Sequence, residues 1–248
     1  MNCLCYTEKK RKTMASFEVT IMANVRNKKK DKKVRAPFPV SYTLGEELCN
    51  SISHGVGAVF AVLALVLMLV QTVPQGNPWK TVSAAVYGAS LILLYTMSTL
   101  YHAFKPNLAK RVFRIFDHCT IYFLIAGTYT PYTLNTLRGP WGWSLFGVVW
   151  GITLLGVVLN AISIEKFKVF SSISYIVMGW AIILAFKPLY DNLASSGLWL
   201  LIGGGVCYTL GIIFYALKKW RYMHSIWHAF VLAGTVMHFF SIYLYVLV

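Results

Sequence analysis

Two histidines stand four residues apart in the stretch "HSIWH" (residues 224–228), at the start of the last strongly apolar segment. Residues i and i+4 share one face of a helix, so both imidazoles point the same way, as the paired histidines of HExxH metalloenzymes do. A third imidazole from His102 would leave a fourth position for water, which is typical of a catalytic zinc site. The residues therefore predict a metal centre of His102, His224 and His228. Zinc suits three imidazoles best, although other divalent ions also bind such sets.

Two further polar residues are predicted to act beside this centre. Ser98 lies one turn before His102 on the same helical face, and Asp117 comes from the next apolar segment. Either side chain could hydrogen-bond the metal's water or orient a ligand. Zinc lowers the pKa of its water toward neutrality, so an adjacent carboxylate could accept the proton. Ser98 and Asp117 are thus the candidate catalytic residues.

A second interpretation of the histidines stays open, in which His224 and His228 lie among lipid headgroups and only hydrogen-bond there. The gathering of several ionisable residues favours a site, because such residues in membrane helices are usually functional. His54 is expected to support the site or to meet headgroups. His238 is expected to be a packed or hydrogen-bonded core histidine.

The composition predicts the surroundings of these residues. Of the 248 residues, 57% are hydrophobic and 12% are charged, whereas a soluble domain carries about 25% charged residues. No segment alternates as a membrane β-barrel strand would. Seven apolar stretches are each close to the roughly 20 residues that a membrane-spanning helix needs. The sequence predicts an all-α membrane protein, a bundle of seven transmembrane helices within residues 41–248, with spans at 55–73, 81–104, 115–134, 143–162, 169–186, 198–217 and 226–247.

The distribution of basic residues predicts the orientation of the bundle. Twenty of the 23 lysines and arginines fall in the N-terminal segment and in alternate loops, which is a strong positive-inside signal. The N-terminus is therefore expected in the cytoplasm and the C-terminus outside, in the plasma membrane. The expected partners are membrane lipids, with anionic headgroups at the basic cytoplasmic face and no nucleic acid. This topology brings a set of ionisable and polar residues to the inner leaflet: His54, Ser98, His102, Asp117, His224 and His228.

The first 40 residues are predicted to form a basic, disordered tail, because charge blocks such as "NKKKDKKVR" repel one another and stay extended. They lack an apolar core of the signal-peptide kind, so no cleavable signal peptide is expected before the first span. The following stretch "FPVSYTLGEELCNSIS" has Leu44, Leu48 and Ile52 at a spacing of four. It predicts a short amphipathic segment at the inner interface, separate from the first span.

Five blocks together resemble the bacterial haemolysin III branch of the progestin and adipoQ receptor (PAQR) superfamily: "EELCNSISHGVGA", "SLILLYTMSTLYHAF", "FDHCTIYFLIAGTYTP", "GPWGWSLFGVVWG" and "HSIWHAFVLAGTVMHF". The resemblance extends from about residue 46 to residue 248. It implies seven helices, a cytoplasmic N-terminus and a zinc ion near the inner leaflet. It maps the metal histidines onto His102, His224 and His228, with Ser98 and Asp117 beside the water.

Three functions remain open at this point. The first is a zinc-dependent hydrolase of a lipid amide or ester, as the ceramidases of the superfamily imply, with Asp117 as the base. The second is a haemolytic or pore-forming protein, and the third is a non-catalytic sensor of lipid or membrane state. The ionisable residues gather in one leaflet, which favours a site over a pore. The sequence does not decide between hydrolase and sensor.

Overall fold

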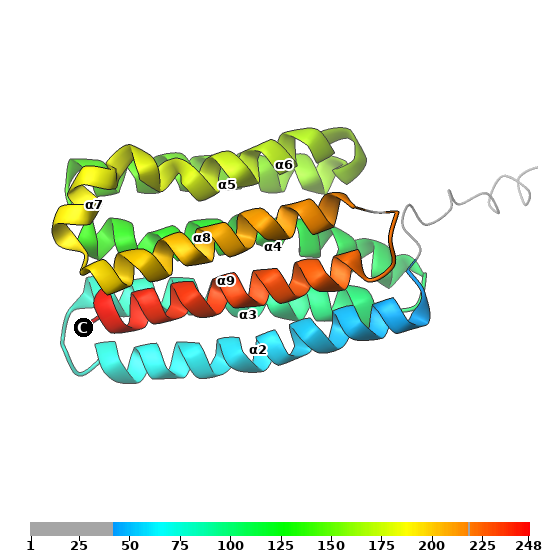
Figure 1. The fold of residues 1–248 in the computed structure, drawn as a ribbon, viewed down its shortest axis with the longest axis horizontal. Helices are drawn as coiled ribbons and strands as arrows, with labels where there is room; N and C mark the ends of the chain where they lie inside the picture. Colours follow the sequence, from blue (N-terminus) through cyan, green and yellow to red (C-terminus); the bar gives the residue numbers. More distant parts are fainter. Residues whose placement is uncertain (1–41, 218) are drawn as a thin grey trace, which may run out of the picture. The chain divides into compact units, whose positions relative to one another are not determined.

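The computed structural model describes residues 42–217 and 219–248, and within these ranges the chain forms helices and turns but no β-strand. Successive connections lie at alternate ends of the bundle (Figure 1). The π-helix η1 (Tyr132–Thr136) continues α4, and the 3-10 helix η2 (Ala181–Ala185) with the short α7 (Phe186–Asn192) continues α6. The seven long helices are α2 (Leu44–Thr72), α3 (Pro78–Ala103), α4 (Leu108–Pro131), α5 (Pro140–Ile162), α6 (Ile164–Trp180), α8 (Ser195–Ala216) and α9 (Met223–Tyr245).

The first helix corrects one prediction. Thr43 and Glu46 form a capping box that satisfies the first backbone N–H groups, so α2 begins at Leu44 and continues unbroken for 29 residues. The predicted interfacial segment and the predicted first span are therefore one helix. Leu44 and Leu48 face outward, whereas Glu46 and Asn50 are buried. The polar face of this stretch points into the bundle and not toward headgroups.

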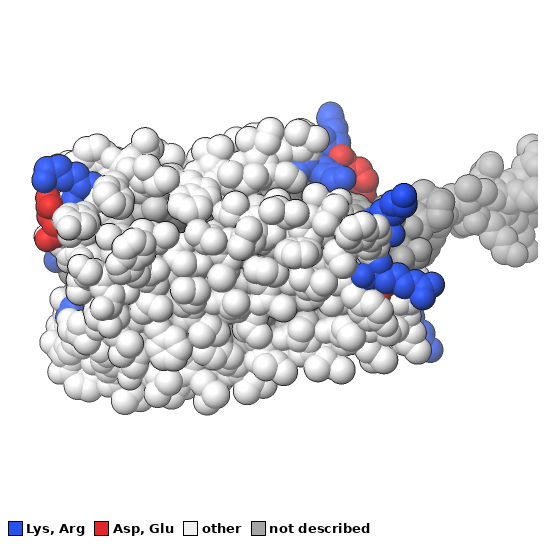
Figure 2. All heavy atoms as spheres, viewed as in Figure 1, with Lys and Arg blue, Asp and Glu red and all other residues white. Residues whose placement is uncertain are grey.

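Most helices of the bundle have the length and the apolar composition of membrane-spanning helices. Among the described residues, six helical segments are long and apolar enough to cross a membrane: α2, α3, α5, α6 with α7, α8 and α9. Charged side chains gather at the two ends of the molecule, and the broad belt between them carries none on the face that Figure 2 shows. The chain is thus an integral, multi-pass membrane protein whose outer helix faces contact lipid.

The seventh long helix, α4, is less apolar than the others. It carries Lys110, Arg111, Arg114 and Asp117, and several of its polar side chains, including Thr128, are buried inside the bundle. A helix that lies mostly inside the bundle does not need an apolar surface on every side. The described residues therefore contain seven long helices, the number that was predicted. A cytoplasmic N-terminus stays a prediction. The predicted basic tail, residues 1–40, lies outside the described residues.

Small residues allow close helix packing, and two glycines of α5 permit a matched test of it. A Cβ at Gly156 would lie 2.1 Å from Cζ of the Tyr122 ring from α4, whereas a Cβ at Gly147 would meet nothing within 4 Å. Since Tyr122 is fully buried, its ring has little room to move. We expect Gly156→Ala to cost about 1–3 kcal/mol through overpacking, which lowers the melting temperature by roughly 3–10 °C.

Thermal unfolding of the purified protein in detergent measures this effect. Gly147→Ala should leave the melting temperature unchanged or raise it slightly, because alanine favours helix more than glycine does. Equal melting temperatures for the two variants would contradict the packing of α5 on α4.

Candidate metal centre

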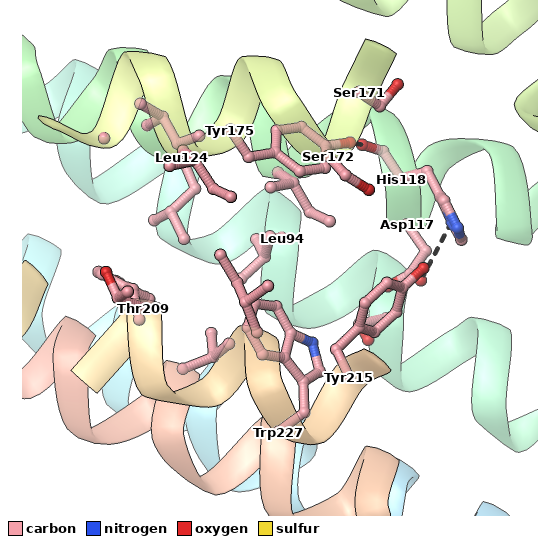
Figure 3. Close-up of a pocket in the computed structure, with 18 of the residues that line it drawn as sticks. Leu94, Asp117, His118, Leu124, Ser171, Ser172, Tyr175, Thr209, Tyr215 and Trp227 are labelled. Carbon is pink, nitrogen blue, oxygen red and sulfur yellow. Dashed lines mark hydrogen bonds and ion pairs between the residues drawn. The ribbon is translucent and has the colours of Figure 1, made fainter. Parts of the chain in front are cut away.

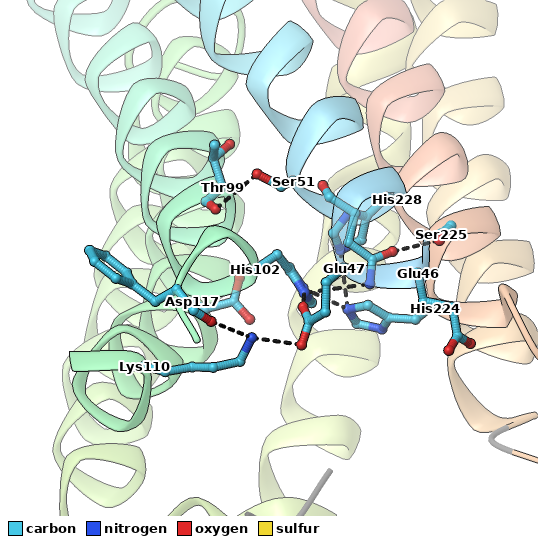
Figure 4. A network of polar contacts seen from close by, with 12 residues as sticks. Glu46, Glu47, Ser51, Thr99, His102, Lys110, Asp117, His224, Ser225 and His228 are labelled. Atoms are coloured by element: carbon cyan, nitrogen blue, oxygen red, sulfur yellow. Dashed lines mark hydrogen bonds and ion pairs between the residues drawn. The ribbon is translucent and has the colours of Figure 1, made fainter. Parts of the chain in front are cut away.

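Three imidazoles converge where α3 ends and α9 begins. The Nε2 atom of His224 lies 3.3 Å from Nε2 of His102 and 3.1 Å from Nε2 of His228. One nitrogen from each histidine lies within 4.8 Å of the other two, a geometry in which the group could hold a metal ion. His102 and His228 are almost fully buried, at 2% and 1% exposure. Figure 4 shows the rings pointing toward one another from the two helices.

The hydrogen bonds of the other ring nitrogens indicate which nitrogens carry protons. Nδ1 of His102 lies 2.7 Å from a carboxylate oxygen of Glu47, and Nδ1 of His228 lies 3.2 Å from the backbone carbonyl of Asn50. A carboxylate and a carbonyl can only accept, so both Nδ1 atoms carry the proton and both Nε2 atoms present lone pairs. His102 and His228 therefore direct lone pairs toward the same nitrogen of His224.

This arrangement fits a cation. A single N–H on His224 cannot satisfy two lone pairs equally, whereas a metal ion satisfies all three nitrogens. Ligands about 2.0–2.1 Å from a tetrahedral zinc lie about 3.3–3.4 Å apart, close to the two observed Nε2 separations of 3.3 and 3.1 Å. The three residues predicted as metal ligands thus meet at one point, in a geometry that could hold a metal ion.

A buried charge network supports His102 and was missed in the sequence. Glu47 of α2 accepts from His102 through one carboxylate oxygen and from Nζ of Lys110, at 2.6 Å, through the other. Lys110, of α4, is only 2% exposed and also donates to the carbonyl of Phe104 at 3.0 Å. Carboxylate–histidine pairs of this kind orient metal ligands and raise their basicity. Figure 4 shows Glu47 between His102 and Lys110.

One spacing in the sequence agrees with this support once the start of α2 is known. Glu47, Asn50 and His54 stand at i, i+3 and i+7, so they share one face of a helix. That face became visible only once α2 was known to begin at Leu44. All three now contact the histidines: His54 stacks on His228 with ring centroids 3.5 Å apart and planes 9° apart.

Replacing Glu47 by glutamine is expected to weaken zinc binding about 10- to 100-fold, because the orienting carboxylate is lost. Competition with a chelator series would measure the affinity. The double variant Glu47→Gln, Lys110→Met removes the buried lysine left without its partner. The double variant should regain the stability of the fold but not the affinity for zinc. Such a result would show that Glu47 acts on zinc binding by orienting His102 and not only by stabilising the fold.

The matched control for this prediction is Glu165→Gln. Glu165 is also paired with a basic residue, Arg114, but its side chain is 60% exposed and makes no contact with the three histidines. Zinc affinity should stay within about twofold of wild type in this variant. An unchanged affinity in Glu47→Gln would show that Glu47 does not orient His102.

A cavity of about 170 Å³ adjoins the histidines, and both candidate catalytic residues line it. Ser98 of α3 and Asp117 of α4 share this lining with His224 and His228. The walls extend along α4, α6, α8 and α9 and are mostly apolar, with Leu94, Leu124 and Trp227 among them (Figure 3). The structure therefore brings all five sequence-predicted site residues to one region, four of them on the cavity itself.

Two more residues lie beside the site, of which His118 also lines the cavity. Nδ1 of His118 donates to the carbonyl of Arg114 at 3.0 Å and lies 3.6 Å from a carboxylate oxygen of Asp117. Tyr42, just before α2, stacks on His224 with centroids 5.1 Å apart. Burial, together with the nearby Tyr101 and Tyr215, raises the pKa of the Tyr42 phenol well above its usual value. Tyr42 therefore contacts His224 as a neutral ring.

Comparisons with known proteins agree on one family. The family described as "Haemolysin-III related" matches residues 42–239. The chain is similar to Hemolysin-3 of Bacillus cereus (44% identical, 82% of this chain and 92% of the relative) and to the Hemolysin-3 homolog of Bacillus subtilis (42%, 82% and 96%). It is more distantly similar to the human Monocyte to macrophage differentiation factor (28%, 85% and 90%). No solved structure matches the chain.

Proposed function

The chain belongs to the haemolysin III family, within the PAQR superfamily, and on that basis we propose that it is a zinc-dependent hydrolase of a lipid amide or ester. One observation carries the proposal: three imidazole nitrogens converge beside a mostly apolar cavity that also contains a carboxylate and a hydroxyl. A closed structural zinc site would need a fourth protein ligand. Three ligands beside a cavity leave a position for water or substrate.

The chemistry would be divided between metal and protein. A zinc ion held by His102, His224 and His228 would lower the pKa of water and would polarise a carbonyl group. In this proposal the Asp117 carboxylate takes the proton that water loses as its oxygen bonds to the carbonyl carbon. Asp117 then returns that proton to the leaving amine or alcohol as the carbon–nitrogen or carbon–oxygen bond breaks. The Ser98 hydroxyl donates a hydrogen bond to the reacting group.

The cavity walls support a lipid as the substrate. The apolar side chains of Leu94, Leu124 and Val231 line the cavity and would exclude water from an acyl chain. Lys168, Ser171 and Ser172 of α6 line the polar end, where a headgroup would lie. The proposal places the amide or ester linkage at the histidines, the acyl chain along α9 and the headgroup toward α6.

Metal removal tests the proposal directly. The purified full-length protein, assayed with fluorescent lipid amides and esters, should release fatty acid at a rate that falls at least 100-fold after chelation. One equivalent of zinc should restore the rate, whereas magnesium should not, because imidazole nitrogens bind it poorly. Zinc-loaded protein that hydrolyses none of a broad panel of amides and esters would overturn the hydrolase proposal and leave the non-catalytic lipid sensor.

A lytic function is the second candidate, favoured by the name of the Bacillus cereus relative. Release of dye from liposomes that contain the purified protein would detect it. Lysis that persists in the metal-free protein would point to assembly of a pore. Lysis that depends on zinc and accompanies fatty acid release would instead be a consequence of hydrolysis, since free fatty acids and single-chain lipids disrupt bilayers.

A further inference from the structure

The cavity continues well beyond the metal centre. His228 and His238, both on α9, line it at two levels, and ten residues of helix separate these levels by about 15 Å. The lining also includes the apolar side chains of Leu94, Leu124 and Val231, and Val231 lies between the two histidines on α9. An acyl chain whose carbonyl lay at the metal-centre histidines would pass these apolar side chains before it reached His238.

His238 presents an unsatisfied acceptor at the far level. The residue is 7% exposed, and its Nε2 donates to the carbonyl of Leu201 at 3.0 Å, so Nδ1 carries a lone pair. The Nε2–Cδ2 edge of the ring packs against Gly204 of α8, which leaves the Nδ1 edge turned away from α8. Nδ1 has no hydrogen-bond partner among the described residues.

Three polar side chains of the cavity lining are already engaged in hydrogen bonds within the chain. The Thr128 hydroxyl donates to the carbonyl of Leu124 at 2.7 Å, and the Tyr208 hydroxyl lies 2.7 Å from that of Thr235. Tyr129 donates to the carbonyl of Gly179 at 3.2 Å and accepts from a backbone N–H. A buried acceptor without a partner destabilises the folded protein. A bound molecule that donates a hydrogen bond to His238 Nδ1 would remove this cost, since no described residue does so.

We propose that His238 binds the hydroxyl group of a hydroxylated acyl chain, which donates a hydrogen bond to Nδ1. The substrate class is then a lipid whose acyl chain carries a hydroxyl in its distal half. This inference rests on the proposed function, which places the substrate's carbonyl group at the three histidines. An extended chain advances about 1.25 Å per carbon, from single bonds of about 1.52 Å. The 15 Å between the two levels therefore corresponds to roughly twelve carbons.

Competition binding tests the inference without requiring catalysis. Delipidated, zinc-loaded protein in detergent would be incubated with tritiated stearate, which is displaced by unlabelled stearate, 3-hydroxystearate or 12-hydroxystearate. We expect 12-hydroxystearate to compete roughly five- to tenfold better than stearate, as one added hydrogen bond allows. 3-Hydroxystearate should compete no better than stearate, because its hydroxyl lies near the carboxyl group.

Substitution of the histidine provides the second comparison. His238→Phe keeps an aromatic ring of similar size without the acceptor, so the preference for 12-hydroxystearate should fall to about one while stearate still binds. His118→Phe replaces a histidine at the other end of the same cavity and should keep the preference.

The outcomes separate this inference from the proposed function. Equal competition by the three fatty acids in wild type would overturn it and assign an internal water to His238 Nδ1. A preference that persists in His238→Phe would also overturn it. Because free fatty acids bind whether or not the protein hydrolyses lipids, a failed activity assay does not alter the result.

Discussion

Replacing His102 or His228 by alanine is expected to reduce the zinc content of the purified protein from about one ion per chain to less than a tenth of that. Each histidine supplies one of three converging nitrogens, and two imidazoles hold zinc far more weakly than three. Elemental analysis of protein purified without added metal would measure the content. His224→Ala should behave in the same way, since its Nε2 lies between the other two.

The control for metal loss is His238→Ala, which removes a buried histidine of the same helix about 15 Å from His228. It should keep about one zinc per chain. Circular dichroism and gel filtration of every variant would show that the bundle remains folded, which its extensive apolar packing favours. Well-folded wild-type protein that contains no metal would overturn the zinc site and with it the hydrolase.

Asp117→Asn is expected to keep the zinc and to lose activity. Asparagine has nearly the same shape as aspartate but cannot accept a proton, and loss of a general base typically slows a reaction by about 10²- to 10⁴-fold. The rate would be measured on whichever lipid amide or ester the wild type hydrolyses best. The zinc content of the same sample distinguishes a loss of proton transfer from a loss of metal.

Asp191→Asn is the matched control for Asp117. Asp191 belongs to α7 and pairs with the exposed Lys187, outside the lining of the cavity. The hydrolysis rate and the zinc content of Asp191→Asn should both equal those of wild type. A rate within twofold of wild type in Asp117→Asn would remove Asp117 from the mechanism, and a loss of zinc in that variant would make Asp117 part of the metal site.

Local patterns in the sequence were sufficient to predict the helices of this protein. Long apolar stretches separated by charged loops predicted seven helices, because a helix satisfies its own backbone hydrogen bonds in a lipid environment. The spacing of four between His224 and His228 fixed their common direction before any fold was known, since that relation depends on helix geometry alone. Family membership followed from the same local blocks and is confirmed by the family match over residues 42–239.

Contacts between helices could not be read in the same way. Whether His102 of α3 reaches the pair on α9 depends on helix rotation and packing, which neighbouring residues in the sequence do not specify. The structure brings Nε2 of His102 to 3.3 Å from that of His224. Glu47 and Lys110 escaped notice for the same reason, because a buried ion pair between α2 and α4 looks in the sequence like two ordinary charges near a membrane surface.

The sequence by itself therefore determined the helices, the family and the candidate ligands, all of which follow from periodicity, hydropathy and residue type. Only the tertiary structure decided that the three nitrogens meet at the spacing of a metal site and that α2 supplies the groups that orient them. It also decided that a cavity extends along α9 as far as His238. These features arise where side chains from different helices meet, and their positions depend on the packing of the whole bundle.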